Sequence, residues 1–497
     1  MHLSPALLRL DRRSPQPLHA QLTTRMAALL DAGTLLPGER LPATRVLAAD
    51  LGVHRTTVVR AYNALRVLGY LVARPGSGAR VRRRLVPRAG DAPPPASAAL
   101  PRRLLRARVR RAPSAEPLPL AALDLATHQP DPALRPFRLL QAAMRAATAR
   151  DRGAALAAYG DPQGSAALRA AIARRLARHG IPCDPDEVIA TDGAQQAFDL
   201  ILRTFLPRRG AIAVEQPTYP RFLELARGHG ARLVPVPMRA DGADLDALQR
   251  AVRQRRLALV YTMPTFQNPT GCVTSSAHRE RVLACCEAAG VGLIEDGFDD
   301  ELQYAGPSVL PIRALDRSGT VLHVGTLSKL AFPGLRVGWI AASRRAIDRL
   351  VAVRGRTSLG GSVLTQRITT ALLERAEFDV YLRRLHRTLR ARCAAISQGL
   401  AVHLPPWVQW QPPAGGYTLW LSWAAAHASE RTVRERAAAL GVAVAPGAPY
   451  FLTRPRRAHL RLSIAMLPVE QVELACEQLG HAFRSAERTA RHRGALA

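Results

Sequence analysis

The chain has 497 residues, with a charged fraction of 22% and a hydrophobic fraction of 48%, as expected of a globular protein of two or more domains. The net charge of +32 favours a polyanionic partner, most simply nucleic acid, although arginine codon bias would supply part of it without function. The six cysteines form no CxxC pair, which argues against a disulfide framework, and we expect no metal site. The sequence shows no apolar signal core and no run of about 18 apolar residues, so we expect a cytoplasmic protein without a membrane partner.

Residues 1–82 predict three helices followed by a hairpin. The first two helices cover 18–30 and 43–50, where apolar residues recur at helical spacing. The third begins near His54 and turns a set of apolar side chains inward: Val58, Ala61, Leu65 and Leu68. Two β-rich runs then flank a Pro-Gly-Ser-Gly tip, which is typical of a wing. Together these elements form a winged helix-turn-helix, whose third helix would lie in the major groove of DNA.

This segment resembles the DNA-binding domain of GntR-type regulators in three stretches, 35–45, 51–58 and 74–78. The resemblance implies DNA contacts from two helices and the wing, made by Arg45, His54, Arg55, Thr56, Thr57, Arg60, Gly76 and Gly78. The alternative for the arginines is a solvated helix face. The family usually has serine where His54 stands, so we expect helix capping or base preference to differ here.

Residues 83–121 have the composition of a linker. They are rich in arginine, proline and alanine, and their only acidic residues are Asp91 and Glu116. Such a segment does not build a core, so we expect a flexible or extended tether. An arginine-rich tether would add salt-sensitive contacts to DNA, and a solvated spacer is an equal alternative.

From residue 122 to 485, β-rich runs alternate with amphipathic helices, which predicts an α/β domain with a mainly parallel sheet. The runs include 211–214, 257–261, 292–294 and 320–324, and the helices include 191–206 and 276–289. Ligand sites in such sheets lie beyond the carboxyl ends of the strands, where the distinctive polar clusters of this chain occur. Residues 486–497 predict a basic tail.

Lys329 is the only lysine among 70 lysines and arginines. A primary amine condenses with an aldehyde, whereas a guanidinium does not, so this lysine is either a functional amine or a chance survivor. Formation of a Schiff base with pyridoxal phosphate is the most familiar reaction that requires lysine.

The polar clusters of this region, taken in order, resemble those of the fold-type I aminotransferases. The resemblance implies pyridoxal 5'-phosphate as the cofactor, with Lys329 as the Schiff-base residue and Asp296 on the pyridine nitrogen. Asn268 is then expected at the ring 3-oxygen and Tyr219 against the ring. The phosphate would be held by Gly193, Ala194, Gln195, Thr326, Ser328 and Arg336.

Three further residues are matched to ligand contacts by the same resemblance. Tyr159 would reach the phosphate of the partner subunit, Arg461 would grip an amino acid carboxylate, and Arg221 would bind a second anionic group. Taken singly, Asp296 and Asn268 could be turn residues and Arg461 a surface ion pair.

Phe298 departs from the family pattern, which commonly has tyrosine there with its hydroxyl on the ring 3-oxygen. Loss of that donor is expected to raise the pKa of the Schiff base, or to leave its tuning to Asn268.

A GntR-type domain joined to an aminotransferase-like body is the arrangement of the MocR group of bacterial regulators, and the chain is identified as a member. The resemblance implies a homodimer on double-stranded DNA with two half-sites. It also implies that pyridoxal phosphate, an amine or an amino acid controls DNA binding. Two alternatives stay open: an active aminotransferase with an accessory DNA-binding domain, and a nucleic-acid binder with an inert body.

Overall fold

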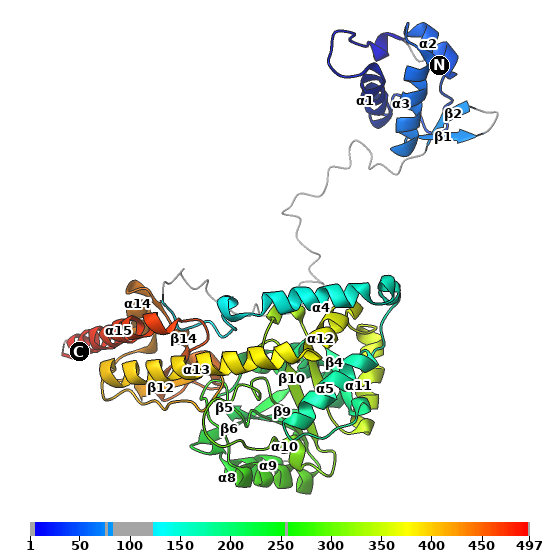
Figure 1. The fold of residues 1–497 in the computed structure, drawn as a ribbon. Coiled ribbons are helices and arrows are strands. Elements are labelled where there is room, and N and C mark those ends of the chain that lie inside the picture. The colour runs from blue at the N-terminus through cyan, green and yellow to red at the C-terminus, as the bar shows by residue number, and fades with distance from the viewer. Residues whose placement is uncertain (1–4, 75–77, 83–122, 254–256, 496–497) are drawn as a thin grey trace. The chain divides into compact units, whose positions relative to one another are not determined.

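The computed structural model describes residues 5–74, 78–82, 123–253 and 257–495 (Figure 1). The chain divides into two compact units, Met1–Arg110 and Arg111–Ala497. The linker expected over 83–121 and the wing residue Gly76 lie outside the described ranges. Within those ranges, no helix is long and apolar enough to cross a membrane.

The N-terminal unit is a winged helix-turn-helix, which confirms the predicted fold. Its elements are η1 (Pro5–Leu8), α1 (Leu18–Asp31), α2 (Thr44–Asp50), α3 (Arg55–Val67), β1 (Leu71–Arg74) and β2 (Gly78–Val81). The two strands pair antiparallel, and the core lies between α1 and α3, where Leu22, Met26 and Val58 are fully buried. The expected burial of Leu68 is wrong, because this residue caps the end of α3 and is 55% exposed. The chain turns at Gly69, so helical spacing no longer sets the direction of that side chain.

An eight-stranded sheet forms the centre of the C-terminal unit. Its order is β4-β11-β10-β9-β8-β5-β6-β7. The strands are β4 (Val188–Thr191), β5 (Ala211–Gln216), β6 (Arg232–Arg239), β7 (Gly242–Ala243), β8 (Leu257–Thr262), β9 (Gly292–Asp296), β10 (Val321–Thr326) and β11 (Gly338–Ala341). The four strand pairs from β10 to β6 are parallel. Strand β11 is antiparallel to its neighbours β4 and β10, and β7 is antiparallel to β6. The mainly parallel sheet is therefore confirmed.

Helices pack around this sheet (Figure 1). They are α4 (Phe137–Ala149), α5 (Ala166–Arg178), α6 (Ala194–Phe205), α7 (Pro220–Gly228), α8 (Leu245–Arg253), α9 (Ser276–Ala289), α10 (Ile312–Leu315), α11 (Arg344–Thr357), α12 (Val363–Leu373) and α13 (Ala376–His403). One apolar cluster joins α6, α7 and α11 to the sheet, and another joins α8 and α9 to it. All six residues of β10 are buried, as expected for a parallel strand with both faces covered.

A smaller sheet follows α13 in the chain. It has the order β12-β15-β14, with β12 (Thr418–Ala424), β14 (Ala445–Pro446) and β15 (Arg457–Ser463). The short strands β3 (Leu123–Asp124) and β13 (Val442–Ala443) pair in parallel. Helices α14 (Glu430–Ala439) and α15 (Val469–Ala495) complete this part, and short 3-10 turns are η3 (Pro132–Leu134), η4 (Arg150–Ala157), η5 (Pro185–Glu187), η6 (Pro333–Leu335) and η7 (Ala448–Tyr450). The segment from 486, expected to be a tail, continues α15 as far as Ala495.

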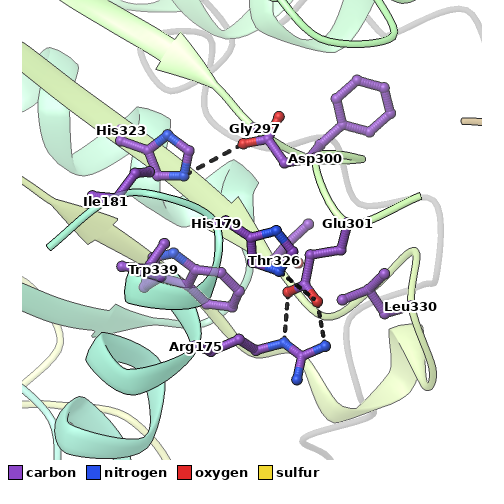
Figure 2. A pocket seen from close by; sticks show the side chains of 12 residues that line it. Arg175, His179, Ile181, Gly297, Asp300, Glu301, His323, Thr326, Leu330 and Trp339 are labelled. Atoms are coloured by element: carbon purple, nitrogen blue, oxygen red, sulfur yellow. Dashed lines mark hydrogen bonds and ion pairs between the residues drawn. The ribbon is translucent and has the colours of Figure 1, made fainter. Parts of the chain in front are cut away.

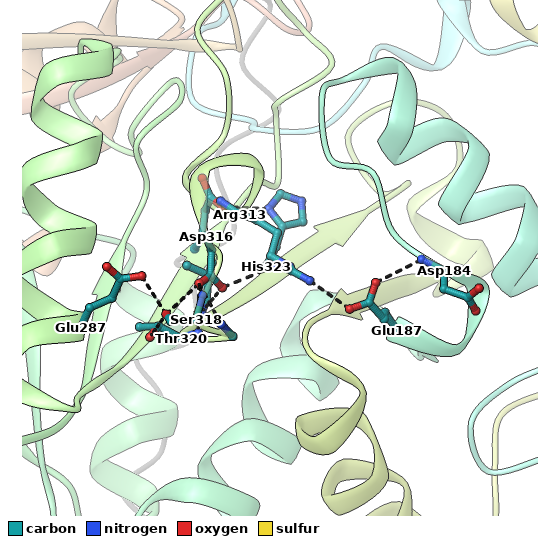
Figure 3. Close-up of polar contacts among 11 residues, drawn as sticks. Asp184, Glu187, Glu287, Arg313, Asp316, Ser318, Thr320 and His323 are labelled. Atoms are coloured by element: carbon teal, nitrogen blue, oxygen red, sulfur yellow. Dashed lines mark hydrogen bonds and ion pairs between the residues drawn. The ribbon is translucent and has the colours of Figure 1, made fainter.

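A polar network fixes the start of β10 (Figure 3). Asp316 accepts hydrogen bonds from the backbone N–H groups of Ser318 at 3.0 Å and Val321 at 2.9 Å. Arg313 of α10 lies 3.5 Å from the Asp316 carboxylate and 3.4 Å from that of Glu187. Because the beginning of β10 is held this way, its far end delivers the following loop, which contains Lys329, to a defined place.

Candidate functional site

A cleft lies beyond the carboxyl ends of the parallel strands, and it brings together most of the residues singled out from the sequence. Those that line it are Ala194, Gln195, Tyr219, Arg221, Asn268, Asp296, Thr326, Ser328, Lys329, Arg336 and Arg461. Phe298 and the segment Ala126–Gln129 also line it. Parallel topology brings the strand-end residues from Ala194 to Arg336 to one edge of the sheet, and Arg461 of the smaller sheet joins them from elsewhere in the fold.

Lys329 is held from two sides. The Nζ of Lys329 donates a hydrogen bond to the carbonyl oxygen of His128 at 2.5 Å. The hydroxyl of Tyr417 donates to the backbone carbonyl oxygen of Lys329 at 2.6 Å. Burial lowers the pKa of Lys329 to about 8, the negative charge of Asp299 opposes this shift, and Arg461 adds to it. With a pKa of about 8, roughly a tenth of the amine is unprotonated at pH 7, and this is the nucleophilic form.

Asp296 ends β9 with its side chain at the cleft. Its Oδ2 accepts a hydrogen bond from the hydroxyl of Tyr261 at 2.6 Å, and its Oδ1 is buried without a hydrogen-bond partner among the described residues. Burial raises the pKa of Asp296 to about 7, against the lowering effect of the Tyr261 bond. Tyr261 is itself fixed by stacking on Phe222 at a ring-centroid distance of 3.7 Å. The free Oδ1 is thus a rigidly placed acceptor.

Asn268 is positioned by the loop after β8. Its neighbour Gln267 donates to the Glu215 carboxylate at 3.1 Å and to the Pro217 carbonyl oxygen at 2.7 Å. The fully buried guanidinium of Arg279 donates to the Pro264 carbonyl oxygen at 2.9 Å and holds the loop from below. Asn268 Oδ1 is buried and has no hydrogen-bond partner within the described part of the chain.

The start of α6 forms a cradle with Arg336. Gly193 caps α6 with a φ of 89° and, as a glycine, has no side chain to bond the first N–H groups of the helix. Arg336 donates to the Asp192 carbonyl oxygen at 2.8 Å, and a Cβ at Gly193 would lie 2.6 Å from its Nη2. Thr326 Oγ1 donates to Ser328 Oγ at 3.0 Å beside them. A helix start with an adjacent guanidinium and two hydroxyls is suited to a phosphate group.

The three residues expected at the ligand's outer parts differ in position. Arg461 of β15 is 6% exposed and donates to the carbonyl oxygen of Ala126. Arg221 lines the cleft and forms an ion pair with Glu224 at 3.1 Å. Tyr159 is 88% exposed and lies instead in a groove with residues 358–364, so one chain alone does not bring it into the cleft.

A cluster of buried polar side chains lies next to the end of β9 (Figure 2). The guanidinium of Arg175 donates a hydrogen bond to the carboxylate of Glu301. The imidazole of His323 lies 3.3 Å from the Glu295 carboxylate and 3.7 Å from the Asp300 carboxylate. Burial acts to lower the pKa of His323, but the hydrogen bond and charge of Glu295 raise it. A Cβ at Gly297 would collide with Asp300 and His323, so only glycine fits between Asp296 and Phe298. This network fixes the turn that follows Asp296.

Three contributors to the cleft were not recognised from the sequence. Tyr261 donates the hydrogen bond that holds Asp296, but we expected no role for it beyond its place in a β-rich run. Its position one residue before the end of β8 could have indicated that it lies near the cleft. The other two, His128 and Asp299, belong to loops that no periodicity or motif marks.

The predicted DNA-binding residues lie on the surface of the N-terminal unit. Arg45 on α2 is exposed, as are His54, Arg55, Thr56 and Arg60 at the start of α3, Thr57 is half-buried, and Gly78 begins β2 with a φ of 79°. His54 is the N-cap of α3, and its Nδ1 accepts from the Thr56 backbone N–H at 3.4 Å. A ring nitrogen therefore takes the capping role of the family's serine, and it does so only while unprotonated.

Comparison with known proteins places both units. Residues 123–479 match aminotransferase class I and II, and residues 18–81 match the bacterial regulatory proteins of the gntR family. The probable rhizopine catabolism regulatory protein MocR of Rhizobium meliloti is 32% identical over 81% of this chain and 81% of that protein. Aromatic-amino-acid aminotransferase 1 of Thermococcus litoralis is 31% identical over 66% of this chain and 79% of that protein. The crystal structure of a multiple substrate aminotransferase from Thermococcus profundus aligns with a TM-score of 0.72 and 27% identity, over 77% of this chain and 97% of that one.

The fold and the cleft are those of aminotransferase class I and II, and the chain belongs to this family. Its GntR-type unit makes it a transcription regulator of the MocR type, a DNA-binding protein with an aminotransferase-like body. The family and its solved structures indicate pyridoxal 5'-phosphate as the cofactor. The cleft fits that group, because it combines a nucleophilic amine, the unpartnered Oδ1 atoms of Asp296 and Asn268, and a phosphate cradle at Gly193 that a Cβ would fill.

Proposed function

We propose that the cleft binds pyridoxal phosphate at Lys329 and that its occupancy by cofactor and an amino ligand controls DNA binding by the N-terminal unit. The supporting observation is that the only lysine of the chain shares one cleft with the unpartnered oxygens of Asp296 and Asn268. We assign residues 1–82 to DNA binding, 83–121 to the tether and 122–485 to the cofactor-binding body.

Each residue of the cleft has a distinct task in this proposal. When bound, pyridoxal phosphate supplies an aldehyde that condenses with primary amines and a ring that withdraws electrons. Asp296 holds a proton on the pyridine nitrogen, and Tyr261 keeps the carboxylate aimed and ionised. Asn268 contacts the 3-oxygen, and Tyr219 borders the ring. The phosphate binds the cradle of Gly193, Ala194, Gln195, Thr326, Ser328 and Arg336.

The ligand that changes DNA binding is proposed to be an amine or amino acid. Arg461 is the carboxylate-binding group, and Arg221 reads a second anionic group at the outer edge of the cleft. Regulation requires that the ligand bind two arrangements of the protein with different free energy. In the homodimer we propose, Tyr159 serves the partner subunit's phosphate, and two DNA-binding units face the two half-sites of an operator.

DNA binding to the region upstream of the chain's own gene, with and without pyridoxal phosphate and a panel of amines, tests this function. We expect cofactor and one amine class to change the apparent Kd, and Lys329→Ala to abolish that response while retaining DNA affinity. A Kd indifferent to cofactor and amines, in a chain that binds the DNA, would contradict the proposal and favour an inert body.

Turnover as an aminotransferase is the second candidate, favoured by the completeness of the cleft around Lys329 and by the named aminotransferases among the relatives. Keto-acid production with many turnovers per site would establish it. A single half-reaction that stops at one equivalent would favour the sensor.

A further inference from the structure

Two ionisable side chains near Lys329 have no part in the function proposed so far. They are His128, in the segment that crosses the cleft, and Asp299, three residues after Asp296. His128 Nε2 lies 3.9 Å from Asp299 Oδ2, and the side chains are 10% and 0% exposed. Neither ring nitrogen of His128 and neither carboxylate oxygen of Asp299 has a hydrogen-bond partner among the described residues.

The surroundings hold this pair in place. The His128 ring lies against Phe298 at a centroid distance of 6.0 Å and against Tyr417 at 5.6 Å. Gly416, with a φ of 67°, lets the backbone pass close to Asp299, where a Cβ would lie 3.2 Å from Oδ2. His128 and Phe298 line the cleft, whereas Asp299 lies behind them.

A buried carboxyl without hydrogen bonds destabilises a fold, and replacing it with a neutral group of the same shape relieves that cost. Asp299 is therefore unfavourable for stability where it stands. Its separation of 3.9 Å from His128 is longer than a hydrogen bond, and catalytic hydrogen bonds tighten to hydrogen-bond length in the complex with ligand.

We propose that Asp299 and His128 form a positioning pair, in which the buried carboxyl orients the imidazole and the imidazole makes the polar contact to the bound cofactor that Phe298 cannot make. This inference rests on the proposed function of the cleft. His128 lines the cleft with its ring centroid 6.0 Å from that of Phe298, so its N–H is available as a replacement donor on the same wall. Asp299 acts through His128 and Lys329.

The charges around the pair make the two members separable. Lys329 faces the negative charges of Asp299 and Asp296 and the positive charge of Arg461. Asp299 faces Lys329, Asp296 and Asp300, with burial the largest influence raising its pKa. Burial lowers the pKa of His128, and Lys329 and Arg461 lower it further, so the imidazole is neutral. Replacing Asp299 therefore removes a negative charge that raises the pKa of Lys329, whereas replacing the neutral His128 removes no charge.

The first test uses the cofactor-free chain and carbon-13 lysine. Because Lys329 is the only lysine, its side chain gives a single labelled lysine signal, whose pH titration reports its pKa directly. We expect Asp299→Asn to lower that pKa by about one unit or more, as loss of a nearby opposite charge does. His128→Gln and the matched control Asp300→Asn, a neighbouring carboxyl that faces His323, should leave it unchanged. An unchanged pKa in Asp299→Asn would overturn the inference.

Thermal unfolding of the same proteins separates positioning from a structural role. Asp299→Asn and Asp299→Leu should both raise the Tm of the cofactor-free chain, because each removes an unpartnered buried carboxyl. A lower Tm for both variants would show that Asp299 supports the fold and would overturn its assignment as a positioning residue.

The second test uses the cofactor-loaded chain. We expect His128→Phe to move the pH midpoint of the bound cofactor's absorbance change, and the added Phe298→Tyr substitution to return it towards the wild-type value. A wild-type chain that binds no cofactor would overturn both this inference and the proposed function. A wild-type chain that binds it, with a His128→Phe variant of the same affinity and midpoint, would overturn this inference alone.

Discussion

Removal of the Tyr261 hydroxyl should make cofactor binding depend more steeply on pH. Tyr261→Phe deletes the hydrogen bond to Asp296 Oδ2, which is 2.6 Å long in a fully buried setting. The stacked contact with Phe222 is retained, so we expect the fold to survive. The hydrogen bond lowers the pKa of Asp296, which burial raises to about 7, so its loss raises that pKa further.

The magnitude follows from the value of a hydrogen bond to a charged group. Such a bond contributes about 2 kcal/mol, which corresponds to a pKa change of roughly 1.5 units. With a wild-type pKa of about 7, half of the Asp296 carboxyls are ionised at neutral pH. In Tyr261→Phe only about 3% would be, so cofactor affinity at neutral pH should fall about 15-fold. Two or more pH units higher, the carboxyl ionises in both proteins and the difference should largely disappear.

Titration of the cofactor-free chain with pyridoxal phosphate, followed by absorbance across a pH series, measures this ratio. Titrations of the cofactor and of Lys329 occur in both proteins and cancel in the ratio. Tyr62→Phe is the matched control, because it removes a buried hydroxyl that donates to the Pro42 carbonyl oxygen at 2.9 Å, in the other unit. A Tyr261→Phe ratio that is constant with pH, or larger at high pH, would refute the role given to the Tyr261 bond.

Three further predictions test the cradle, the recognition helix and the loop beneath Asn268. Gly193→Ala, at a φ of 89° with a Cβ 2.6 Å from Arg336 Nη2, should weaken binding of pyridoxal phosphate while leaving phosphate-free pyridoxal unaffected; equal losses for both would count against the cradle. His54→Ala should destabilise the N-terminal unit by about 1 kcal/mol in thermal unfolding of the full chain, whereas His54→Ser should retain the cap, and two equally stable variants would disprove the capping role. Arg279→Leu removes the guanidinium that donates to the carbonyl oxygens of Thr274 and Leu310 and should cost roughly 2–3 kcal/mol in denaturant unfolding, a prediction that a loss below about 1 kcal/mol would refute.

The elements that could be predicted from the sequence are those that residue spacing controls. Helix α3 and the buried strand β10 follow from the period of their apolar residues, because one face or both faces must be buried. The clustering of Asn268, Asp296 and Lys329 follows from parallel topology, which brings the ends of successive strands to one edge. The start of α3 near His54 was predicted, but we expected helix capping or base preference to differ there, and the capping bond made by the His54 ring nitrogen was not predicted.

The parts that could not be predicted depend on contacts between distant segments. His128 and Lys329 are 201 positions apart, and no local pattern indicates that a carbonyl from one meets the amine of the other. Leu68 keeps the helical spacing but lies where the helix has ended. The extension of α15 to Ala495 escaped prediction because its outer face is basic, while Ala482, Phe483 and Ala486 keep an apolar face fully buried.

The surroundings of the buried arginines differ from those of the single lysine. Arg354 and Arg392 are 1% and 4% exposed. Arg354 donates to two backbone carbonyl oxygens and Arg392 to one, and each lies near one carboxylate. Such sites use several donors of a planar group that stays charged when buried, which an ammonium does not match. Lys329 occupies the opposite situation, because burial there leaves the amine partly unprotonated and only an amine can condense with an aldehyde. Arginine can supply a positive charge at any position, whereas only lysine supplies the amine at position 329, and this explains why lysine persists there.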